Sequence, residues 1–475
     1  MEQQKFIRFF VRHKVFFVLF FLCAFLLLLP LFLRSSLIGD ESYFFLRIAE
    51  QLHQGKWYDS LSYGGRENTY VMGWPWLLSL FGKFMDLVLA TKILLFFFGL
   101  GSFTLLYFIL RALKIRDSYQ WLGLFFFALS PSFLYLFSVS SVHAILFFLS
   151  LLGFLFYLKE KYWVSVLIFA VFPFFDLFAG LIPLFILFAY HVLERKKLRN
   201  FFIAVSGFLA VTLLATLQRV MTLGLPVMIE KIQVQQNFLT DIGHPYGFGT
   251  FAFVLSLFGF VYLWRVYKKI LFLFSLVFLF VMGLYFPWVF FYFNLFVAFL
   301  MAYGIFKLWN RDWESKLIQR FAVFILITGV ILSSVYYYAQ IRAMEPRDAQ
   351  IQAMAYLKKV SDPQTSVFSH YSKGFWINAL AERKNIMDSH FAYAPDVQRR
   401  YNWSQTFIES TKLEESSEFR ETYPFAYIYI DGTLRKKLWK EDDDGLLYLL
   451  QYSKQFKRVF KNGDVELWRI KRDGE

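Results

Sequence analysis

Residues 15–33 read VFFVLFFLCAFLLLLPLFL, an apolar run that no charged side chain interrupts. A helix needs about 20 such residues to cross the hydrocarbon core of a bilayer. Comparable runs recur at Lys92–Leu110, Leu271–Phe286 and Val323–Tyr338. The 475 residues are 58% hydrophobic and include 64 Phe, more apolar side chains than one soluble core can bury. The sequence therefore predicts a helical protein that crosses a membrane several times.

The first apolar run is expected to stay in the mature protein. It is longer than the apolar region of a secretory signal peptide, and no small-residue cleavage site follows it. The single cysteine, Cys23, lies inside this run. Neither a disulfide nor a cysteine metal site is therefore expected.

The net charge of +15 fits membrane topology better than nucleic-acid binding. Four basic residues within 5–14 precede the first run, which predicts a cytoplasmic N-terminus by the positive-inside rule. The later clusters of basic residues also fall on the cytoplasmic side if residues 70–84, interrupted by Gly73 and Pro75, enter the membrane without crossing it. These clusters are Arg111–Arg116, Lys159–Lys161, Arg195–Arg199, Arg265–Lys269 and Lys307–Arg320. Because the basic residues form no single stripe, no nucleic-acid partner is expected.

Eleven spans fit this charge distribution and place the C-terminus outside. They are expected at 15–33, 90–110, 120–138, 141–158, 162–176, 177–193, 200–217, 249–264, 270–286, 288–306 and 320–338. Residues 1–339 would form the transmembrane domain, with outer loops at 34–89 and 218–248.

Residues 340–475 are predicted to form a small extracytoplasmic α/β domain, because polar composition resumes there. Strands are expected at Ser366–Tyr371 and Ala426–Asp431, and helices at Pro346–Val360 and Gly445–Tyr452. Asn462-Gly463 suits the tight turn of a hairpin between Arg458–Phe460 and Val465–Ile470.

Two adjacent carboxylates, Asp40 and Glu41, begin the first outer loop, close to the end of the first run. A partly apolar site can raise the pKa of such an acid so that it serves as a general base, and carboxylates also hold divalent cations against phosphate. In an alternative interpretation, Asp40 caps an amphipathic helix over Glu41–His53 whose Phe44, Phe45, Ile48 and Leu52 face the bilayer.

The order of motifs in this loop resembles the GT-C glycosyltransferases, membrane enzymes that take a sugar from a polyprenyl-phosphate carrier. In the protein mannosyltransferase and aminoarabinose transferase branches, an Asp-Glu pair is followed by a tyrosine, as Asp40, Glu41 and Tyr43 are here. A loop helix ending in glycine and a Pro-containing apolar segment come next, similar to Arg47–Tyr58 and Tyr70–Leu78. The resemblance implies a GT-C-like fold and sugar transfer with inversion of configuration.

A second resemblance, to the catalytic subunit of oligosaccharyltransferase, lies in the C-terminal region. Residues 369–377 read SHYSKGFWI and are followed by Ala381-Glu382-Arg383 and Asp388. That family has Trp-Trp-Asp-Tyr-Gly, a Trp-Ile-like pair, an Arg and an Asp at similar distances. Gly374 and Trp376 match the pattern, whereas His370-Tyr371-Ser372 replaces the part that reads the acceptor sequence.

Outer arginines are candidates for binding the lipid phosphate, because a guanidinium can give phosphate two parallel hydrogen bonds. Arg219 follows the seventh predicted span and Arg66 lies in the first loop, although either could instead contact lipid headgroups. The turn-rich stretch 241–249 places His244 where a flap could cover a site, but a plain turn is an equal alternative.

Metal dependence is open from the sequence. The stretch from Ser130 to His143 resembles a region of the oligosaccharyltransferases in which a Pro-containing half-span precedes an acidic metal motif. The acids are absent from this stretch, so only His143 could supply a metal ligand there. Asp176 lies between two short spans, either as a loop acid or as a site acid. Asp40, His143 and Asp176 together could hold Mg²⁺ or Mn²⁺, with substrate phosphates completing the shell.

The predicted function is transfer of a sugar from a polyprenyl-phosphate donor to a glycan, lipid or protein acceptor outside the cytoplasmic membrane. Asp40 is the expected base. A transporter would place polar sites near the bilayer midplane and show internal repeats, which this sequence lacks. A non-catalytic membrane scaffold with an outer binding domain stays open, because part of the acceptor-reading motif and the second acidic motif are missing.

Overall fold

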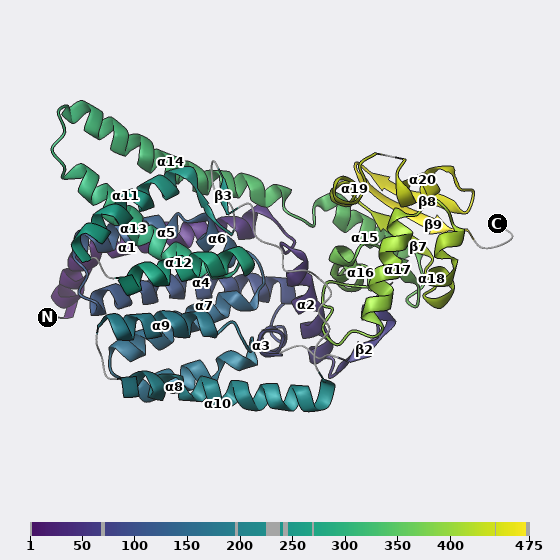
Figure 1. Ribbon diagram of the computed structural model, residues 1–475, viewed down its shortest axis with the longest axis horizontal. Coiled ribbons are helices and arrows are strands. Elements are labelled where there is room, and N and C mark those ends of the chain that lie inside the picture. The colour runs from purple at the N-terminus through teal and green to yellow at the C-terminus, as the bar shows by residue number, and fades with distance from the viewer. Residues whose placement is uncertain are drawn as a thin grey trace.

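The computed structural model describes residues 2–67, 72–194, 198–224, 238–240, 246–267, 270–441 and 443–471. Figure 1 shows a bundle of roughly aligned helices on one side and a smaller domain containing a sheet on the other. The helices α2 and α3 and the strand β2 of the first loop lie where the two parts meet.

Among the described residues, five helices are long and apolar enough to cross a membrane. They are α1 (Glu2–Leu33), α4 (Leu87–Ala112), α10 (Leu198–Leu223), α13 (Val289–Trp309) and α14 (Lys316–Ala343). Shorter helices complete the bundle: α5 (Asp117–Ala128), α6 (Pro131–Leu136), α7 (Val142–Leu158), α8 (Tyr162–Ala170), α9 (Leu181–Leu193), α11 (Thr250–Tyr267) and α12 (Ile270–Tyr285).

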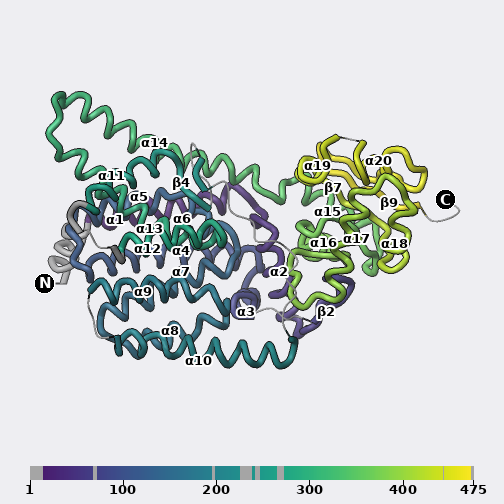
Figure 2. The backbone as a smooth tube through the Cα atoms, in the orientation of Figure 1, coloured from purple at the N-terminus to yellow at the C-terminus, as the bar shows by residue number. Residues whose placement is uncertain are grey.

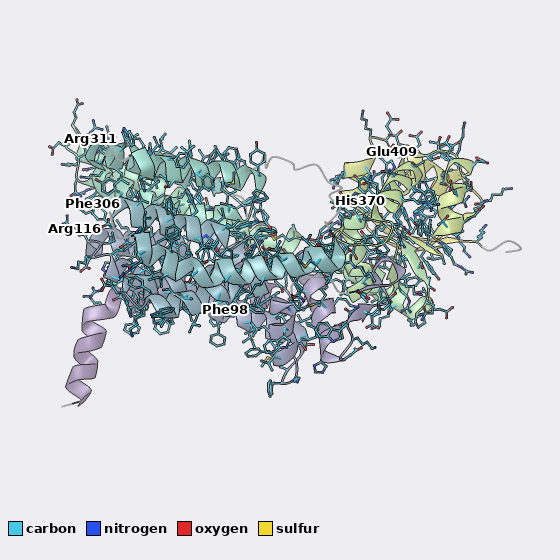
Figure 3. All side chains as sticks on the ribbon, turned by 60° about the horizontal axis from the view of Figure 1, so that its bottom comes forward. Phe98, Arg116, Phe306, Arg311, His370 and Glu409 are labelled. Carbon is cyan, nitrogen blue, oxygen red and sulfur yellow. The ribbon has the colours of Figure 1, made fainter. Side chains whose placement is uncertain are left out.

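Five of the eleven predicted spans fall on the five long helices, and the other six fall on shorter or broken ones. The predicted span 120–138, for example, divides into α5 and α6, because Pro131 starts a new helix at its first position. The number of crossings therefore stays a prediction. Arg116 and Arg311, from two basic clusters, lie at the end of the bundle farthest from the C-terminal domain (Figure 3).

The first loop comprises α2 (Asp40–His53), β1 (Tyr58–Asp59), β2 (Arg66–Glu67) and α3 (Gly73–Phe81). Strands β1 and β2 pair antiparallel. Helix α3 has nine residues and rises only about 14 Å, which is too short to cross a bilayer. This length agrees with the expectation that residues 70–84 enter without crossing.

Helix α2 packs against protein on its apolar face. Phe44, Phe45 and Ile48 are buried, and the Phe44 ring lies 4.7 Å from that of Phe375 in the C-terminal domain. The alternative interpretation, in which these side chains face the bilayer and Asp40 caps the helix, is therefore wrong. The N-cap is Gly39, and no side chain caps this end.

The C-terminal residues form a five-stranded sheet in the order β6-β5-β7-β9-β8, flanked by helices. Its strands are β5 (Ser366–Phe368), β6 (Lys384–Asn385), β7 (Tyr427–Ile430), β8 (Phe456–Asn462) and β9 (Val465–Ile470). The helices are α15 (Asp348–Val360), α16 (Gly374–Ala379), α17 (Val397–Glu409), α18 (Ser417–Thr422), α19 (Gly432–Leu438) and α20 (Gly445–Tyr452).

Strands β6, β5 and β7 run parallel, while β8 and β9 form the antiparallel hairpin predicted around Asn462-Gly463. Gly463 has a φ of 59°, a conformation that glycine adopts without strain. Two short strands of the second outer loop, β3 (Leu239–Thr240) and β4 (Phe248–Gly249), pair parallel.

The first loop is inserted into the C-terminal domain. The Tyr63 side chain is only 2% exposed and belongs to the hydrophobic core of that domain. Its N–H donates to Asn385 Oδ1 at 2.7 Å, its hydroxyl donates to the Asp388 carbonyl at 3.0 Å, and its carbonyl accepts from Arg400 at 2.9 Å. The loop and the domain therefore share one core.

The connection from α14 to α15 is also held against the first loop. The Arg34 guanidinium donates to the Met344 carbonyl at 2.6 Å, and the Gly39 N–H donates to the Glu345 carbonyl at 2.8 Å. Figure 2 shows the chain passing directly from α14 into α15 beside this loop. The C-terminal domain is thus joined to the start of α2 from two sides.

Replacing Tyr63 by Ala should destabilise the C-terminal domain and release the first loop from it. Removing a buried aromatic side chain costs about 3–5 kcal/mol. Thermal unfolding of the purified protein measures this loss. Trp57→Ala, at a position of the same loop that is 65% exposed, is the matched control and should change the midpoint little. Equal midpoints for Tyr63→Ala and the control would contradict the shared core.

Candidate active site

The acid pair stands at the first turn of α2, directly after Gly39. Ser42 fixes this turn: its hydroxyl donates to the Ile38 carbonyl at 2.5 Å and accepts from the Ser140 N–H at 2.9 Å. Ser140 lies two residues before Val142, the first residue of α7. The first loop and the turn before α7 are therefore held together at the position of the acids.

Asp40 and Glu41 are half-buried, and each accepts one hydroxyl contact. Ser389 Oγ donates to Asp40 Oδ2 and Ser141 Oγ donates to Glu41 Oε1, both at 3.4 Å. These bonds are long, and a carboxylate has about four lone-pair sites. Both acids therefore retain capacity to accept hydrogen bonds from a substrate.

The surroundings of Asp40 and Glu41 affect the pKa values of the two acids differently. Burial raises the pKa of Glu41 to about 8, and the charge of Asp40 adds to this effect. Burial also raises the pKa of Asp40, but the backbone N–H groups at the helix start and the Lys373 ammonium oppose it. At neutral pH Glu41 thus mostly keeps its proton, whereas the backbone N–H groups and Lys373 stabilise the ionised form of Asp40.

Lys373 reaches this region from the C-terminal domain through a buried network. Its ammonium forms ion pairs with Glu345 and with Asp431, the latter at 3.3 Å, and lies 4.2 Å from the centroid of the Trp376 ring. Glu345 belongs to the connection after α14. The network therefore places a positive charge near Asp40 and ties it to both parts of the protein.

Arg66, a predicted phosphate ligand, lies in the interface between loop and domain. It forms an ion pair with the buried Asp388 at 3.3 Å and donates to the His390 carbonyl at 2.6 Å. Tyr43 is likewise buried, and its hydroxyl donates to the Leu37 carbonyl at 3.4 Å. The described contacts of both residues support the loop that carries the acid pair.

Arg219 lies near the end of α10 and lines an open, largely apolar cavity of about 540 Å³. Other lining residues come from α3, from the turn before α9 and from α7 and α10: Met72, Gly73, Trp76, Leu77, Ile145, Val171, Pro173, Phe174, Phe175, Leu177 and Ala215. The charge of Arg219 acts on His390, next in sequence to Ser389. On the α3 side of the cavity, Trp74 Nε1 donates to Ser140 Oγ at 3.0 Å, which joins this wall to the turn that holds the acid pair.

Asp176 lies in the turn before α9, where its Oδ1 accepts from the N–H groups of Phe178 and Ala179 at 2.8 and 2.7 Å. Its charge contributes to the raised pKa of Glu41, so it belongs to the same neighbourhood. His143 starts α7 and stacks on Trp288 with a centroid distance of 4.9 Å.

Within the described part of the chain, no three His, Cys, Asp or Glu side chains converge as a metal site would require. The suggested set of Asp40, His143 and Asp176 is therefore not arranged as a complete ligand shell. His244 falls outside the described residues. Nearby, the Tyr246 hydroxyl lies 3.3 Å from that of Tyr135, so the end of this loop rests on α6.

Four residues of the site were not among those predicted: Ser141, Lys373, Ser389 and His390. Lys373 lies inside the SHYSKGFWI stretch, and Ser389 and His390 follow the matched Asp388. That resemblance had singled out the segment that the structure places beside the acid pair. Nothing in the sequence could show that this segment meets Asp40, because the contact between residues 40 and 389 depends on tertiary folding.

A scan against protein-family profiles finds no match, and a search of curated proteins finds no relative. Among solved structures, the chain is similar to the apo oligosaccharyltransferase of Archaeoglobus fulgidus, with a TM-score of 0.65 and 13% identity, covering 93% of this chain and 72% of that one. Other structures of this archaeal enzyme contain an acceptor peptide, dolichol phosphate, or Zn with sulfate.

Two bacterial structures show the same likeness. ArnT of Cupriavidus metallidurans, bound to undecaprenyl phosphate, has a TM-score of 0.58 and 11% identity, covering 95% of this chain and 97% of that one. The mycobacterial arabinofuranosyltransferase AftD has a TM-score of 0.57 and 12% identity, covering 96% and 40%. All three are GT-C glycosyltransferases. The chain therefore has the GT-C fold, as the resemblance of its first loop implied.

The raised pKa of Glu41 predicts how stability depends on pH. The folded protein holds the Glu41 proton more tightly than an unfolded chain, whose pKa is near 4.5. The free energy of unfolding should therefore fall as pH rises from about 4.5 to about 8, and Glu41→Gln should remove this part of the slope. Thermal unfolding between pH 5 and pH 9 measures it.

The exposed Glu67 provides the control for this experiment, because Glu67→Gln removes the same charge outside the buried turn. Its pH profile should match that of the unmodified protein. If Glu41→Gln and Glu67→Gln gave identical profiles, the assignment of a proton to Glu41 would be wrong.

Proposed function

We propose that this protein is a membrane glycosyltransferase that transfers a sugar from a polyprenyl-phosphate-linked donor to an acceptor on the non-cytoplasmic face, with inversion. The observation that carries the proposal is that α3 lines an apolar cavity together with Arg219 and is also bonded, through Trp74 and Ser140, to the turn that holds the half-buried acid pair. A polyprenyl-phosphate sugar has a matching group for each feature: an apolar tail for the cavity, an anionic phosphate for Arg219 and a sugar for the acid pair.

The donor would lie with its isoprenoid chain along the cavity between α3 and α10. An open, membrane-embedded cavity suits an isoprenoid chain, because its lining residues are mainly apolar. The phosphate would then face Arg219, whose planar guanidinium suits phosphate oxygens. This arrangement brings the sugar toward Asp40, and it is supported by the undecaprenyl phosphate bound to ArnT.

In the reaction, the acceptor hydroxyl would attack the anomeric carbon from the side opposite the phosphate. A bond forms between the acceptor oxygen and that carbon while the bond to the phosphate oxygen breaks. The acceptor proton passes to Asp40, and the electron pair leaves with the phosphate beside Arg219. Glu41, protonated at neutral pH, can donate a hydrogen bond without placing a second negative charge in the site.

A divalent cation such as Mg²⁺ or Mn²⁺ would need Asp40 and oxygen atoms of the donor phosphate, because the described side chains do not form a three-ligand set. Bound there, it would neutralise charge on the leaving phosphate. The Zn in one structure of the archaeal oligosaccharyltransferase is consistent with a cation in this fold.

The proposed orientation places the end of the bundle with Arg116 and Arg311 in the cytoplasm, and the C-terminal domain outside. The eleven crossings and the cytoplasmic membrane of the cell belong to the same proposal. The acceptor, whether glycan, lipid or protein, would approach from the outer side, between the first loop and the C-terminal domain.

Replacing Asp40 by Asn should abolish most transfer while preserving the fold, because Asn has the same shape but cannot take the proton. Loss of a general base lowers turnover by about a hundred- to ten-thousandfold. The measurement is transfer of labelled sugar from polyprenyl-phosphate donors in proteoliposomes. Full activity of Asp40→Asn would remove Asp40 from the mechanism. Uptake into vesicles with no covalent product would indicate a transporter, and binding without a product would indicate a scaffold.

Replacing Arg219 by Met should weaken binding of the donor about ten- to a hundredfold, since a hydrogen-bonded charge on the phosphate is lost. Arg219→Lys should recover part of the affinity. Arg311→Met, at the opposite end of the bundle, is the control and should bind donor normally (Figure 3). Unchanged affinity in Arg219→Met would show that the phosphate lies elsewhere.

A further inference from the structure

The segment Asp388–Tyr393 of the C-terminal domain contacts both the start of α2 and the residue that follows α10. At one end, the Ser389 hydroxyl donates to Asp40 Oδ2 at 3.4 Å. At the other, the Tyr393 hydroxyl donates to the carbonyl of Gly224, just beyond α10, at 3.4 Å. The segment therefore spans from the acid pair to the helix that carries Arg219.

The backbone of His390 is fixed within this segment. Its N–H donates to Asp388 Oδ1 at 3.0 Å, and its carbonyl accepts from Arg66 at 2.6 Å. Asp388 is fully buried and also accepts from Ser62 at 2.6 Å. The position of His390 is thus set by the same contacts that join the first loop to the domain.

The imidazole of His390 packs on α2, and the charge of Arg219 acts on it. Its ring centroid is 5.2 Å from that of Phe44, which is one helical turn after Asp40. Burial and the charges of Arg66 and Arg219 lower the pKa of His390 to about 3. The ring is therefore neutral at physiological pH and offers one N–H donor and one acceptor nitrogen.

We propose that His390 is a further substrate-binding residue, which donates an imidazole N–H to a phosphate oxygen of the lipid-linked donor beside Arg219. This inference rests on the proposed function. A positive potential that disfavours an imidazolium also attracts a phosphate anion, so one location suits a neutral donor and an anionic ligand together. The C-terminal domain would then contribute directly to recognition of the donor, in addition to holding the acid pair.

His390→Phe and His390→Gln separate packing from hydrogen bonding. Phe keeps an aromatic ring against Phe44 but has no donor, whereas Gln offers an amide N–H at a similar distance from the backbone. Binding of undecaprenyl phosphate, and of undecaprenol as the probe without phosphate, is measured on the full-length protein in detergent. His53→Phe, at an exposed histidine at the end of α2, is the control.

His390→Phe should weaken binding of undecaprenyl phosphate roughly ten- to a hundredfold and leave undecaprenol unchanged. His390→Gln should regain a large part of the loss, and His53→Phe should bind like the unmodified protein. In transfer assays, His390→Phe should raise KM for the donor more than it lowers kcat. A melting temperature equal to that of the unmodified protein checks that the segment still folds.

Two other results would contradict the proposals, and they separate the role of His390 from the proposed function. If the unmodified protein prefers undecaprenyl phosphate and His390→Phe keeps that preference in full, the role of His390 is overturned while the proposed function stands. If the unmodified protein does not distinguish undecaprenyl phosphate from undecaprenol, the proposed function fails, and the inference fails with it.

Discussion

The buried carboxylate of Asp388 is the contact on which the arrangement of the site depends. It accepts from Ser62, Arg66 and the His390 N–H, so one side chain of the C-terminal domain organises the first loop and the segment that crosses the site. Arg66 and Asp388 are both buried, and removing one partner of such a pair strands the other charge at a cost of about 3–5 kcal/mol. The same contacts determine where α2 begins relative to the domain. The position of the acid pair therefore depends on residues more than 300 positions away in the chain.

This docking gives the two parts of the protein separate chemical tasks. The bundle supplies most of the lining of the apolar cavity, including Arg219, while the first loop supplies two acids whose environments differ. The C-terminal domain adds Lys373, whose charge favours the ionised form of Asp40, and Ser389, which contacts that acid directly. In the proposed function, Asp40 would be the base, Glu41 its protonated neighbour and Arg219 the ligand of the phosphate.

Hydropathy and charge were enough to predict a polytopic helical bundle, and the Asn-Gly turn and neighbouring runs predicted the C-terminal hairpin, because these signals are local. The acid pair was proposed from its place in the first loop together with family resemblance, and its role stays a prediction. The bilayer-facing interpretation of Phe44, Phe45 and Ile48 failed because periodicity marks an apolar face without identifying what covers it. Ser389 and His390 could not be assigned for a similar reason: their roles arise from contacts between distant segments. Arg66 has a side chain that suits phosphate, but its ion pair with Asp388 could be identified only from the folded structure.

The central claim is that the carrier phosphate binds between the cavity and the acid pair. A cryo-EM structure of the protein with undecaprenyl phosphate tests it most directly. The account predicts the isoprenoid chain along α3 and α10, the phosphate in contact with Arg219 and His390, and Asp40 facing the open side of the phosphate. A phosphate bound at the opposite end of the bundle, near Arg116 and Arg311, would contradict it.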